Sequence, residues 1–527
     1  MPLAALAVLV PGSAQADLGA YVKARAAAAD GAVDAAAAGY AAALTAAPGD
    51  EVVAIRAYRN ALAAGDLALA RRAAAVLVRS DVAPPDTALL AFADAVRTKN
   101  KVAADDALGR IGAGPLDFLT PVLRAWVAFD RGGDPFPILD GATESGLSRR
   151  YIAEHRALLL LASNRRDEGV AALRAALSAD PGSIDLRWNA ASLLAGIGDR
   201  RAARDILAGE DATMTGLRDG LVAARPGAAF GTSRLLTRLA ADLQGQETQT
   251  LAILLTRSAL SLDPGDDRAR LLLAAALGEE GALDRAQLVL GTIRPDSPFY
   301  SAAVAERIDL RRKQGDPVQA LALALALATA KGASVRDIRR YADLLSDQGR
   351  DGEAARLYAE ALALAGAEAN WIHHLQLGGA LERSGDWAGA LPHLRKAVEL
   401  APDEPVALNY LGYAQVERGE NLTSAVALLE RANRLRPDDP AITDSLGWGY
   451  YRIGDIARAL PLLEQAAQGQ PGSVTINEHL GDAYWRAGRR FEARYAWRAA
   501  SINADAAQKK RLAEKLADGV VQRMAAN

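Results

Sequence analysis

The sequence contains no cysteine, which excludes disulfide bonds, thiolate metal sites, thiol nucleophiles and lipid attachment through an N-terminal cysteine. Aromatic residues make up only 5% of the 527 residues, although half of the chain is hydrophobic. Few stretches alternate Val, Ile, Thr and aromatic residues at period two, so β-strands are not expected. Alanine dominates instead, and with leucine it is among the residues most easily placed in a helix. The composition therefore predicts an all-α protein.

Neither sign of charge predominates. The chain has 61 Lys and Arg against 64 Asp and Glu, a formal net charge of −3, and no block of five or more like charges occurs. A nucleic-acid binder normally carries a basic stripe, so a nucleic-acid partner is not expected. Charges also interrupt every apolar stretch within a few turns, whereas a bilayer-spanning helix needs about 20 apolar residues. A transmembrane segment is therefore not expected either.

The first sixteen residues have the pattern of a secretory signal peptide. Residues 3–10 are apolar, residues 11–13 (Pro-Gly-Ser) interrupt them, and Ala14-Gln15-Ala16 forms a small-x-small cleavage site before Asp17. The basic segment that normally opens such a signal is missing, which would be explained by a true start that lies upstream, within a longer signal. The alternative is an Ala-rich N-terminal tail. We expect a mature chain that begins at Asp17 in the periplasm, with a cytoplasmic location as the alternative.

The C-terminal third repeats itself at intervals of 34 or 35 residues. Four kinds of residue recur: Leu-Gly pairs at Leu377, Leu411, Leu446 and Leu480; glycines at Gly385, Gly419, Gly454 and Gly488; alanines at Ala390, Ala425, Ala459 and Ala493; and alanines at Ala397, Ala432, Ala466 and Ala500. Pro402, Pro437 and Pro471 close three of these units.

Each recurring residue has a mechanical role in a pair of helices. The glycine of Leu-Gly has no Cβ and lets the second helix approach the first. The next glycine ends the first helix in a left-handed conformation, and the proline ends the second helix. The two alanines lie two turns apart on one face of the second helix, where close packing needs a small side chain. Two such helices and two turns fill 34 residues, an arrangement that resembles the tetratricopeptide repeat.

Weaker copies of the pattern extend towards the N-terminus, and we expect about fourteen helical hairpins between Asp17 and Asp505. The predicted fold is a superhelical tetratricopeptide solenoid. Its expected parts are an array with irregular repeats at 17–213, a joint at 214–232, a second array at 233–505 and a capping helix within 506–527. Leu512, Leu516 and Val520 are apolar at intervals of four, as expected for an end helix that keeps a solenoid soluble.

The sequence shows no catalytic motif: a Walker loop, GxSxG, HExxH and a Rossmann fingerprint are all missing. His373, His374 and His393 fall in one repeat, but the first two point about 100° apart on a helix. We therefore expect no metal and no cofactor. The repeats leave no length for a catalytic domain, so the chain is expected not to be an enzyme.

The expected binding surface is the concave wall formed by the first helix of each hairpin. Aromatic and arginine side chains supply much of the energy at protein interfaces, and several gather at the positions expected to face a ligand. The alternative is that these aromatics stack between repeats and stiffen the solenoid. The predicted partner-binding residues are Asn409, Tyr413, Asp444, Trp448, Tyr451, Arg452, Glu478, Asp482, Trp485 and Arg486.

Three runs in the repeats at 371–505 are more specific than the general pattern: Asn-Tyr-Leu-Gly-Tyr at 409–413, Asp-Ser-Leu-Gly-Trp at 444–448 and His-Leu-Gly-Asp-Ala-Tyr-Trp at 479–485. They resemble the C-terminal block of proteobacterial envelope tetratricopeptide proteins, some of which are lipoprotein adaptors of carboxyl-terminal processing proteases. The resemblance implies a periplasmic adaptor that binds a protease or its substrates, although this chain has no lipidation cysteine. The alternatives are a cytoplasmic co-chaperone-like binder of peptide tails and a scaffold of a polysaccharide secretion system.

Overall fold

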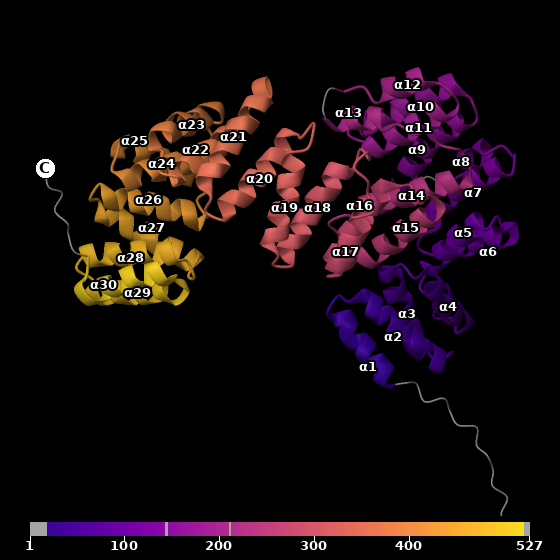
Figure 1. Ribbon diagram of the computed structural model, residues 1–527, viewed down its shortest axis with the longest axis horizontal. Helices are drawn as coiled ribbons and strands as arrows, with labels where there is room; N and C mark the ends of the chain where they lie inside the picture. The colour runs from indigo at the N-terminus through magenta and orange to yellow at the C-terminus, as the bar shows by residue number, and fades with distance from the viewer. Residues whose placement is uncertain (1–17, 143–145, 210–211, 521–527) are drawn as a thin grey trace, which may run out of the picture. The chain divides into compact units, whose positions relative to one another are not determined.

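The computed structural model describes residues 18–142, 146–209 and 212–520 (Figure 1). Thirty α-helices and two short 3-10 helices make up the regular structure of these residues, which contain no β-strand. The all-α prediction is confirmed. The predicted signal peptide, residues 1–16, lies outside the described residues. None of the described helices is long and apolar enough to cross a bilayer.

The chain divides into two compact units between Leu323 and Ala324. The helices of the N-terminal unit are α1 (Leu18–Ala29), α2 (Val33–Ala46), α3 (Glu51–Ala64), α4 (Leu67–Arg79), α5 (Thr87–Arg97), α6 (Lys101–Gly112), η1 (Asp117–Leu119), α7 (Thr120–Asp130), α8 (Phe136–Asp140), α9 (Gly146–Ala162), α10 (Arg166–Ala179), α11 (Ile184–Gly196), α12 (Arg200–Ile206), α13 (Ala212–Asp219), α14 (Ala228–Asp242), α15 (Gln249–Leu262), α16 (Asp267–Glu279), α17 (Leu283–Leu290) and α18 (Tyr300–Lys313). Helix α19 (Pro317–Ala328) spans the division.

The helices of the C-terminal unit are α20 (Val335–Asp347), α21 (Asp351–Ala365), η2 (Gly366–Glu368), α22 (Trp371–Arg383), α23 (Trp387–Leu400), α24 (Pro405–Arg418), α25 (Leu422–Leu435), α26 (Pro440–Arg452), α27 (Ile456–Gly469), α28 (Val474–Arg486), α29 (Arg490–Asn503) and α30 (Ala506–Asp518). In chain order, the thirty α-helices form fourteen consecutive pairs, with α13 and α30 left single. This confirms the expected number of hairpins.

One repeat of the C-terminal unit shows how the recurring residues act. A Cβ on Gly412 of α24 would lie 2.8 Å from Leu429 of α25, so only glycine allows the two helices to come this close. Gly419 ends α24 at a φ of +70°, and Ala425 and Ala432 are fully buried. The turn after Gly419 is one residue longer than in the neighbouring repeats, and Asn421 within it takes the left-handed conformation at a φ of 48°. The roles expected for these residues are confirmed.

The boundary between the units differs from the predicted joint at 214–232, which lies inside the N-terminal unit. The reason is that α14, α15 and α16 do not start a new array. Helix α15 packs on α3 and α5, and α14 packs on α5, α7 and α9 (Figure 1). The Arg257 guanidinium of α15 donates to the carbonyls of Leu62 and Ala63 at 2.9 and 2.7 Å and so caps α3. Contacts made by α14 and α15 therefore tie this stretch to the helices at the beginning of the chain.

Most of the predicted joint consists of a single helix, α13, followed by a segment without helix. Helix α13 has no partner in the hairpin series, and the chain then runs without helix as far as α14. The Ala224 N–H donates to the Ser192 carbonyl of α11 at 2.9 Å. A Cβ on Gly196 would lie 2.1 Å from the Ala224 carbonyl oxygen, so glycine at 196 permits this close crossing. This segment is fastened to α11 rather than acting as a joint.

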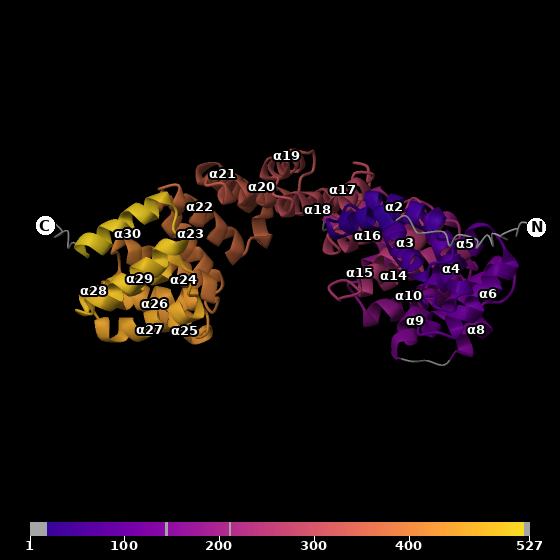
Figure 2. The same cartoon turned by 90° about the horizontal axis from the view of Figure 1, so that it is seen from below.

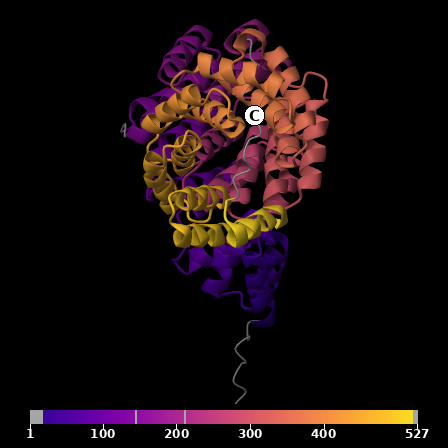
Figure 3. The same ribbon diagram turned by 90° about the vertical axis from the view of Figure 1, so that its left-hand side faces the viewer.

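The C-terminal unit stacks its hairpins regularly from α22 to α29, and the series follows an arc (Figures 1 and 3). Helix α30 closes the series and packs on α29 (Figure 2). Leu512 of α30 is fully buried, with Leu516 and Val520 partly buried beside it. The predicted capping helix is confirmed, although it ends at Asp518. The regular part of the C-terminal unit therefore presents four consecutive first helices: α22, α24, α26 and α28.

Candidate functional site

The first helices of the C-terminal unit line a groove of about 490 Å³, which we call the first-helix groove. Its walls come from α22, α24 and α26 and from the residues around the start of α28. The lining residues are Glu382, Arg383, Asn409, Tyr410, Tyr413, Ala414, Glu417, Arg418, Ala441, Asp444, Ser445, Gln470, Ser473, Thr475 and Ile476. Three of the predicted binding residues, Asn409, Tyr413 and Asp444, therefore lie in one groove.

Asn409 provides an unused hydrogen-bond acceptor in this groove. Its amide oxygen Oδ1 is buried and has no hydrogen-bond partner among the described residues. A buried polar atom left unpaired costs about 1–3 kcal/mol, so such an atom is expected to find a partner in the functional state. One helical turn further along α24, Tyr413 is partly buried. Burial, with the charges of Glu417 and Asp444, raises the pKa of Tyr413, so its hydroxyl remains a protonated donor at neutral pH.

The charged residues of the groove are mostly neutralised by one another or by their neighbours. Glu382 and Arg418 form an ion pair at 2.7 Å, and Arg383 pairs with Asp351 at 2.9 Å. Asp444 is buried and lies 2.9 Å from the Nδ1 of His479. The groove therefore offers tyrosine rings, an amide and paired charges rather than a free excess of one sign.

The predicted residues Trp448 and Tyr451 form part of a stack of rings instead of an open wall. Trp448 is parallel to His479 with ring centroids 4.0 Å apart, and parallel to Tyr451 at 4.6 Å. The indole N–H of Trp448 donates to a carboxylate oxygen of Glu417. Only 9% of Trp448 and 8% of Tyr451 are exposed, so most of each ring contacts protein. Their surroundings agree with the alternative stated above, in which these aromatic rings stack between repeats.

Arg452 and Arg486 lie outside the residues that line the groove. Arg452 donates to the Glu417 carbonyl at 3.1 Å, and the Arg486 guanidinium lies over the Tyr451 ring at 5.2 Å from its centroid. Both arginines hold neighbouring first helices together in this arrangement. His479 was not among the predicted site residues, yet it contacts both Asp444 and Trp448. Its place directly before Leu480 of the repeat is the signal that could have indicated it.

Glu478, Asp482 and Trp485, which were expected to face a ligand, are instead covered by α30. Arg511 makes two hydrogen bonds to Glu478 at 2.7 and 2.8 Å, and Lys515 lies 2.7 Å from Glu478 and 2.6 Å from Asp482. The partly buried Trp485 ring packs in an apolar cluster to which α28, α29 and α30 all contribute. The physical reason is that first helices stack side by side, so these positions contact the next helix in the series, and α30 occupies that place.

The carboxylates under α30 are held in different ways. Burial acts to raise the pKa of Glu478, but hydrogen bonds from Arg511 and Lys515, together with their charges, outweigh it and lower the pKa to about 2. Burial raises the pKa of Asp482 even though Lys515 and the Trp497 indole N–H both contact it. Glu478 is thus a charged anchor of the capping helix at neutral pH.

His374 and His393 face each other across α22 and α23, with their Nδ1 atoms 3.0 Å apart and their rings stacked. A neutral pair satisfies this geometry when one Nδ1–H donates to the other Nδ1, and burial lowers the pKa of both rings. His373 instead caps α22 together with Asn370. Within the described residues, no group of three or more His, Cys, Asp or Glu side chains is placed to hold a metal ion.

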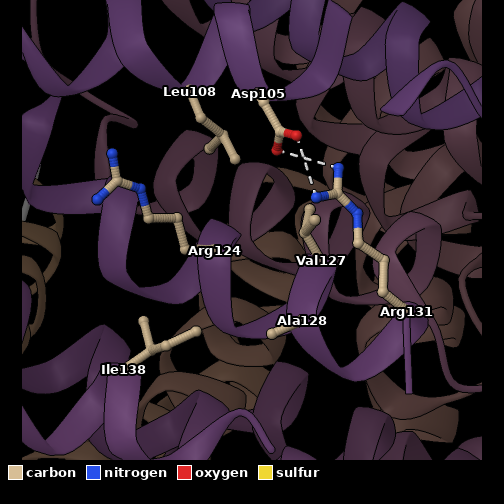
Figure 4. A pocket seen from close by; sticks show the side chains of 7 residues that line it. All are labelled: Asp105, Leu108, Arg124, Val127, Ala128, Arg131 and Ile138. Carbon is tan, nitrogen blue, oxygen red and sulfur yellow. Dashed lines mark hydrogen bonds and ion pairs between the residues drawn. The ribbon is translucent and has the colours of Figure 1, made fainter. Parts of the chain in front are cut away.

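The N-terminal unit has hollows of its own. One of about 770 Å³ lies among α11, α14, the segment 219–225 and the turns before α16 and before α18, with Trp188, Phe230 and Phe299 in its wall. A smaller one of about 290 Å³ lies among α6, α7 and α8 (Figure 4). The single acid in the lining of this smaller hollow, Asp105, is paired with Arg131 at 3.0 Å. The smaller hollow therefore does not bring together an acid and a base that are free to act.

Comparison with known proteins places the repeat in a family. Residues 339–405, 375–440 and 445–509 match the tetratricopeptide repeat family. The C-terminal unit carries tetratricopeptide repeats. Proteins built from this repeat generally act as scaffolds that mediate protein–protein interactions.

Several solved tetratricopeptide-repeat structures resemble the chain in fold. A thermophilic TPR protein of Thermus thermophilus is 22% identical, with 35% of this chain and all of that chain covered at a TM-score of 0.32. A tetratricopeptide repeat protein of Parabacteroides merdae is 16% identical, with 47% and 96% covered at a TM-score of 0.40. YrrB, described as a TPR protein with an unusual peptide-binding site, is 19% identical, with 33% and 89% covered at 0.28. No curated protein matches the sequence.

Proposed function

We propose that this protein is a non-enzymatic adaptor that binds an extended segment of a partner protein in the first-helix groove. The observation that carries the proposal is the unpaired Oδ1 of Asn409, which lies in a groove lined by three successive first helices. This oxygen would accept a hydrogen bond from a backbone N–H of an extended peptide. The tyrosines beside it offer rings for apolar side chains of the peptide.

The paired charges of the groove limit the kind of segment that fits. Because Glu382 and Arg418 neutralise each other and Asp444 already contacts His479, a strongly charged peptide would have to break existing polar contacts. We therefore propose a segment with neutral, partly apolar side chains, held through its backbone. The predicted binding residues Arg452 and Arg486 do not line this groove.

The proposed location is the periplasm, and a carboxyl-terminal processing protease or its substrates are the proposed partners. Support for the location comes from the signal-like residues 1–16, and support for the partner comes from the resemblance of residues 371–505 to envelope adaptors.

Site-specific cross-linking tests the groove directly. A photoreactive benzoylphenylalanine in place of Tyr413 should cross-link a partner in cells, whereas the same residue in place of Arg434, on the second helix α25, should not. A synthetic peptide of the cross-linked segment should then bind about tenfold more weakly to Asn409→Leu, because that variant removes the acceptor. Equal cross-linking from both positions, or unchanged affinity of Asn409→Leu, would place the partner on another surface.

A further inference from the structure

The outer face of α29 carries three large apolar side chains in water. Phe491, Tyr495 and Ile502 are 71%, 56% and 77% exposed. They are spaced by four and seven residues and therefore lie on one face of the helix. The Phe491 and Tyr495 rings contact each other edge to face, with centroids 4.9 Å apart. We call these three residues the α29 triad.

The repeat itself shows that packing does not require the triad. The second helices α23, α25 and α27 are internal references, because each aligns with α29 on its buried alanine. The residues that align with Phe491 are Ala388, Thr423 and Ala457. Those that align with Tyr495 are Pro392, Ala427 and Pro461, and those that align with Ile502 are Glu399, Arg434 and Gln468. Small or polar side chains thus serve the same positions in three sister helices. The triad is a feature of the last repeat alone among these four.

Basic residues surround the triad in the sequence. Residues 486–518 contain nine Lys and Arg against four Asp and Glu. Arg511 and Lys515 are paired with Glu478 and Asp482, and with these two acids counted the net charge is +3, whereas the whole chain has a net charge of −3. Arg498 lies on the same helix face, seven residues after Phe491, and is exposed. Lys509 and Lys510 are also exposed, near the start of α30, which follows α29 after two residues. An occupant of this surface should therefore be anionic.

We propose that the α29 triad and its basic surroundings form a peripheral docking surface for an anionic lipid bilayer. Aromatic and aliphatic side chains on one helix face enter the boundary between headgroups and acyl chains, while Arg and Lys attract anionic headgroups. A stable protein interface normally takes about 20–30 residues from each partner. Here the apolar anchors are confined to one helix, since the neighbouring α27 offers Ala457, Pro461 and Gln468 at the same level. Three apolar side chains on a single helix, with basic residues near them, therefore suit a lipid surface better than a protein interface.

Vesicle flotation with the full chain tests this proposal. The protein should float with vesicles that contain phosphatidylglycerol and not with pure phosphatidylcholine vesicles, and high salt should weaken the association. The test variant combines Phe491→Ala, Tyr495→Ala and Ile502→Gln, which are residues that the sister helices carry at these positions. It should lose at least tenfold in vesicle affinity while its circular dichroism and melting temperature stay unchanged. The control Leu435→Gln, which replaces an exposed leucine of α25, should bind as the parent does.

Three results would overturn the proposal. The triple variant could bind vesicles as well as the parent, or the parent could bind neutral vesicles equally. Alternatively, light scattering could show a dimer that the triple variant loses, without any vesicle binding, in which case the face is an interface between two copies. The outcome is independent of the first-helix groove, because Asn409→Leu should leave vesicle binding intact. Failure of the groove proposal and failure of this one are thereby distinguishable.

Discussion

Trp448 and His479 come from successive first helices, α26 and α28, and their rings lie parallel with centroids 4.0 Å apart. The same His479 contacts Asp444 through Nδ1, so one histidine joins an aromatic ring and a carboxylate of the preceding repeat. A residue at the wall of the solenoid thus also fastens two repeats to each other. Because Trp448 and Asp444 both take part in this contact between repeats, substitutions of either residue are expected to change stability as well as binding.

Trp448→Ala should destabilise the C-terminal unit rather than act only on binding. The ring is 9% exposed and stacked on two others, and truncation of a buried aromatic side chain typically costs about 3–5 kcal/mol. Thermal and urea unfolding followed by circular dichroism would measure the loss. The matched control is Phe491→Ala, which removes a ring that is 71% exposed and should change the free energy of unfolding by less than about 0.5 kcal/mol. Equal stability of the two variants would contradict the stacking role.

The capping helix should loosen in acid through Glu478. Because the folded pKa of Glu478 is about 2, below its ordinary value, this residue stabilises the fold above pH of about 4.5, and the contribution is lost as pH falls towards 2. A shift of this size corresponds to at most about 3 kcal/mol, and solvent screening reduces it. Unfolding free energies measured between pH 7 and 2 should therefore fall less steeply for Glu478→Gln, which is already destabilised at pH 7.

The acid prediction has a control on the same helix. Glu514→Gln removes an exposed carboxylate of α30. The free energy of unfolding of this variant should depend on pH as that of the parent does. The raised pKa of Asp482 acts in the opposite direction, because protonation of that buried carboxylate in acid favours the fold. If Glu478→Gln and the parent lose stability in parallel as pH falls, Glu478 does not hold the cap.

Gly231→Ala should disrupt the contact that ties α14 to α7. A Cβ at this position would lie 2.0 Å from the indole of Trp126, which is fully buried and cannot move aside. Overpacking of this kind typically costs about 1–3 kcal/mol, and we expect a loss near the upper end in chemical denaturation.

The control for this glycine is Gly109→Ala in α6, where no atom lies within 4 Å of the added Cβ. Alanine is favoured over glycine within a helix by about 0.5–1 kcal/mol, so this variant should be slightly more stable than the parent. A stable Gly231→Ala variant would show that α14 does not need this close approach.

Export can be tested on the native protein. The apolar residues 3–10 and the Ala-Gln-Ala site at 14–16 predict a mature chain that begins at Asp17. N-terminal sequencing of protein purified from its own cells should find Asp17, and fractionation should find it outside the inner membrane. A mature protein that retains Met1 or Pro2 would favour the cytoplasmic alternative.

The sequence by itself determined the class of fold and the form of each repeat. Leu-Gly pairs, left-handed glycines and buried alanines act within one hairpin, over fewer than about 35 residues, so their spacing carries the information. The same reasoning found the groove residues Asn409 and Tyr413 and the capping helix α30, because their positions follow from the repeat.

Only the tertiary structure decided which of those positions remain open. Whether Glu478, Asp482 and Trp485 face water depends on what packs against them, and α30 covers them through Arg511 and Lys515. The same is true of α14 and α15, which the repeat pattern assigned to the second array but which pack on α3, α5 and α7. Contacts such as Arg257 with the end of α3 join residues nearly 200 positions apart, and the spacing within a repeat carries no information about them.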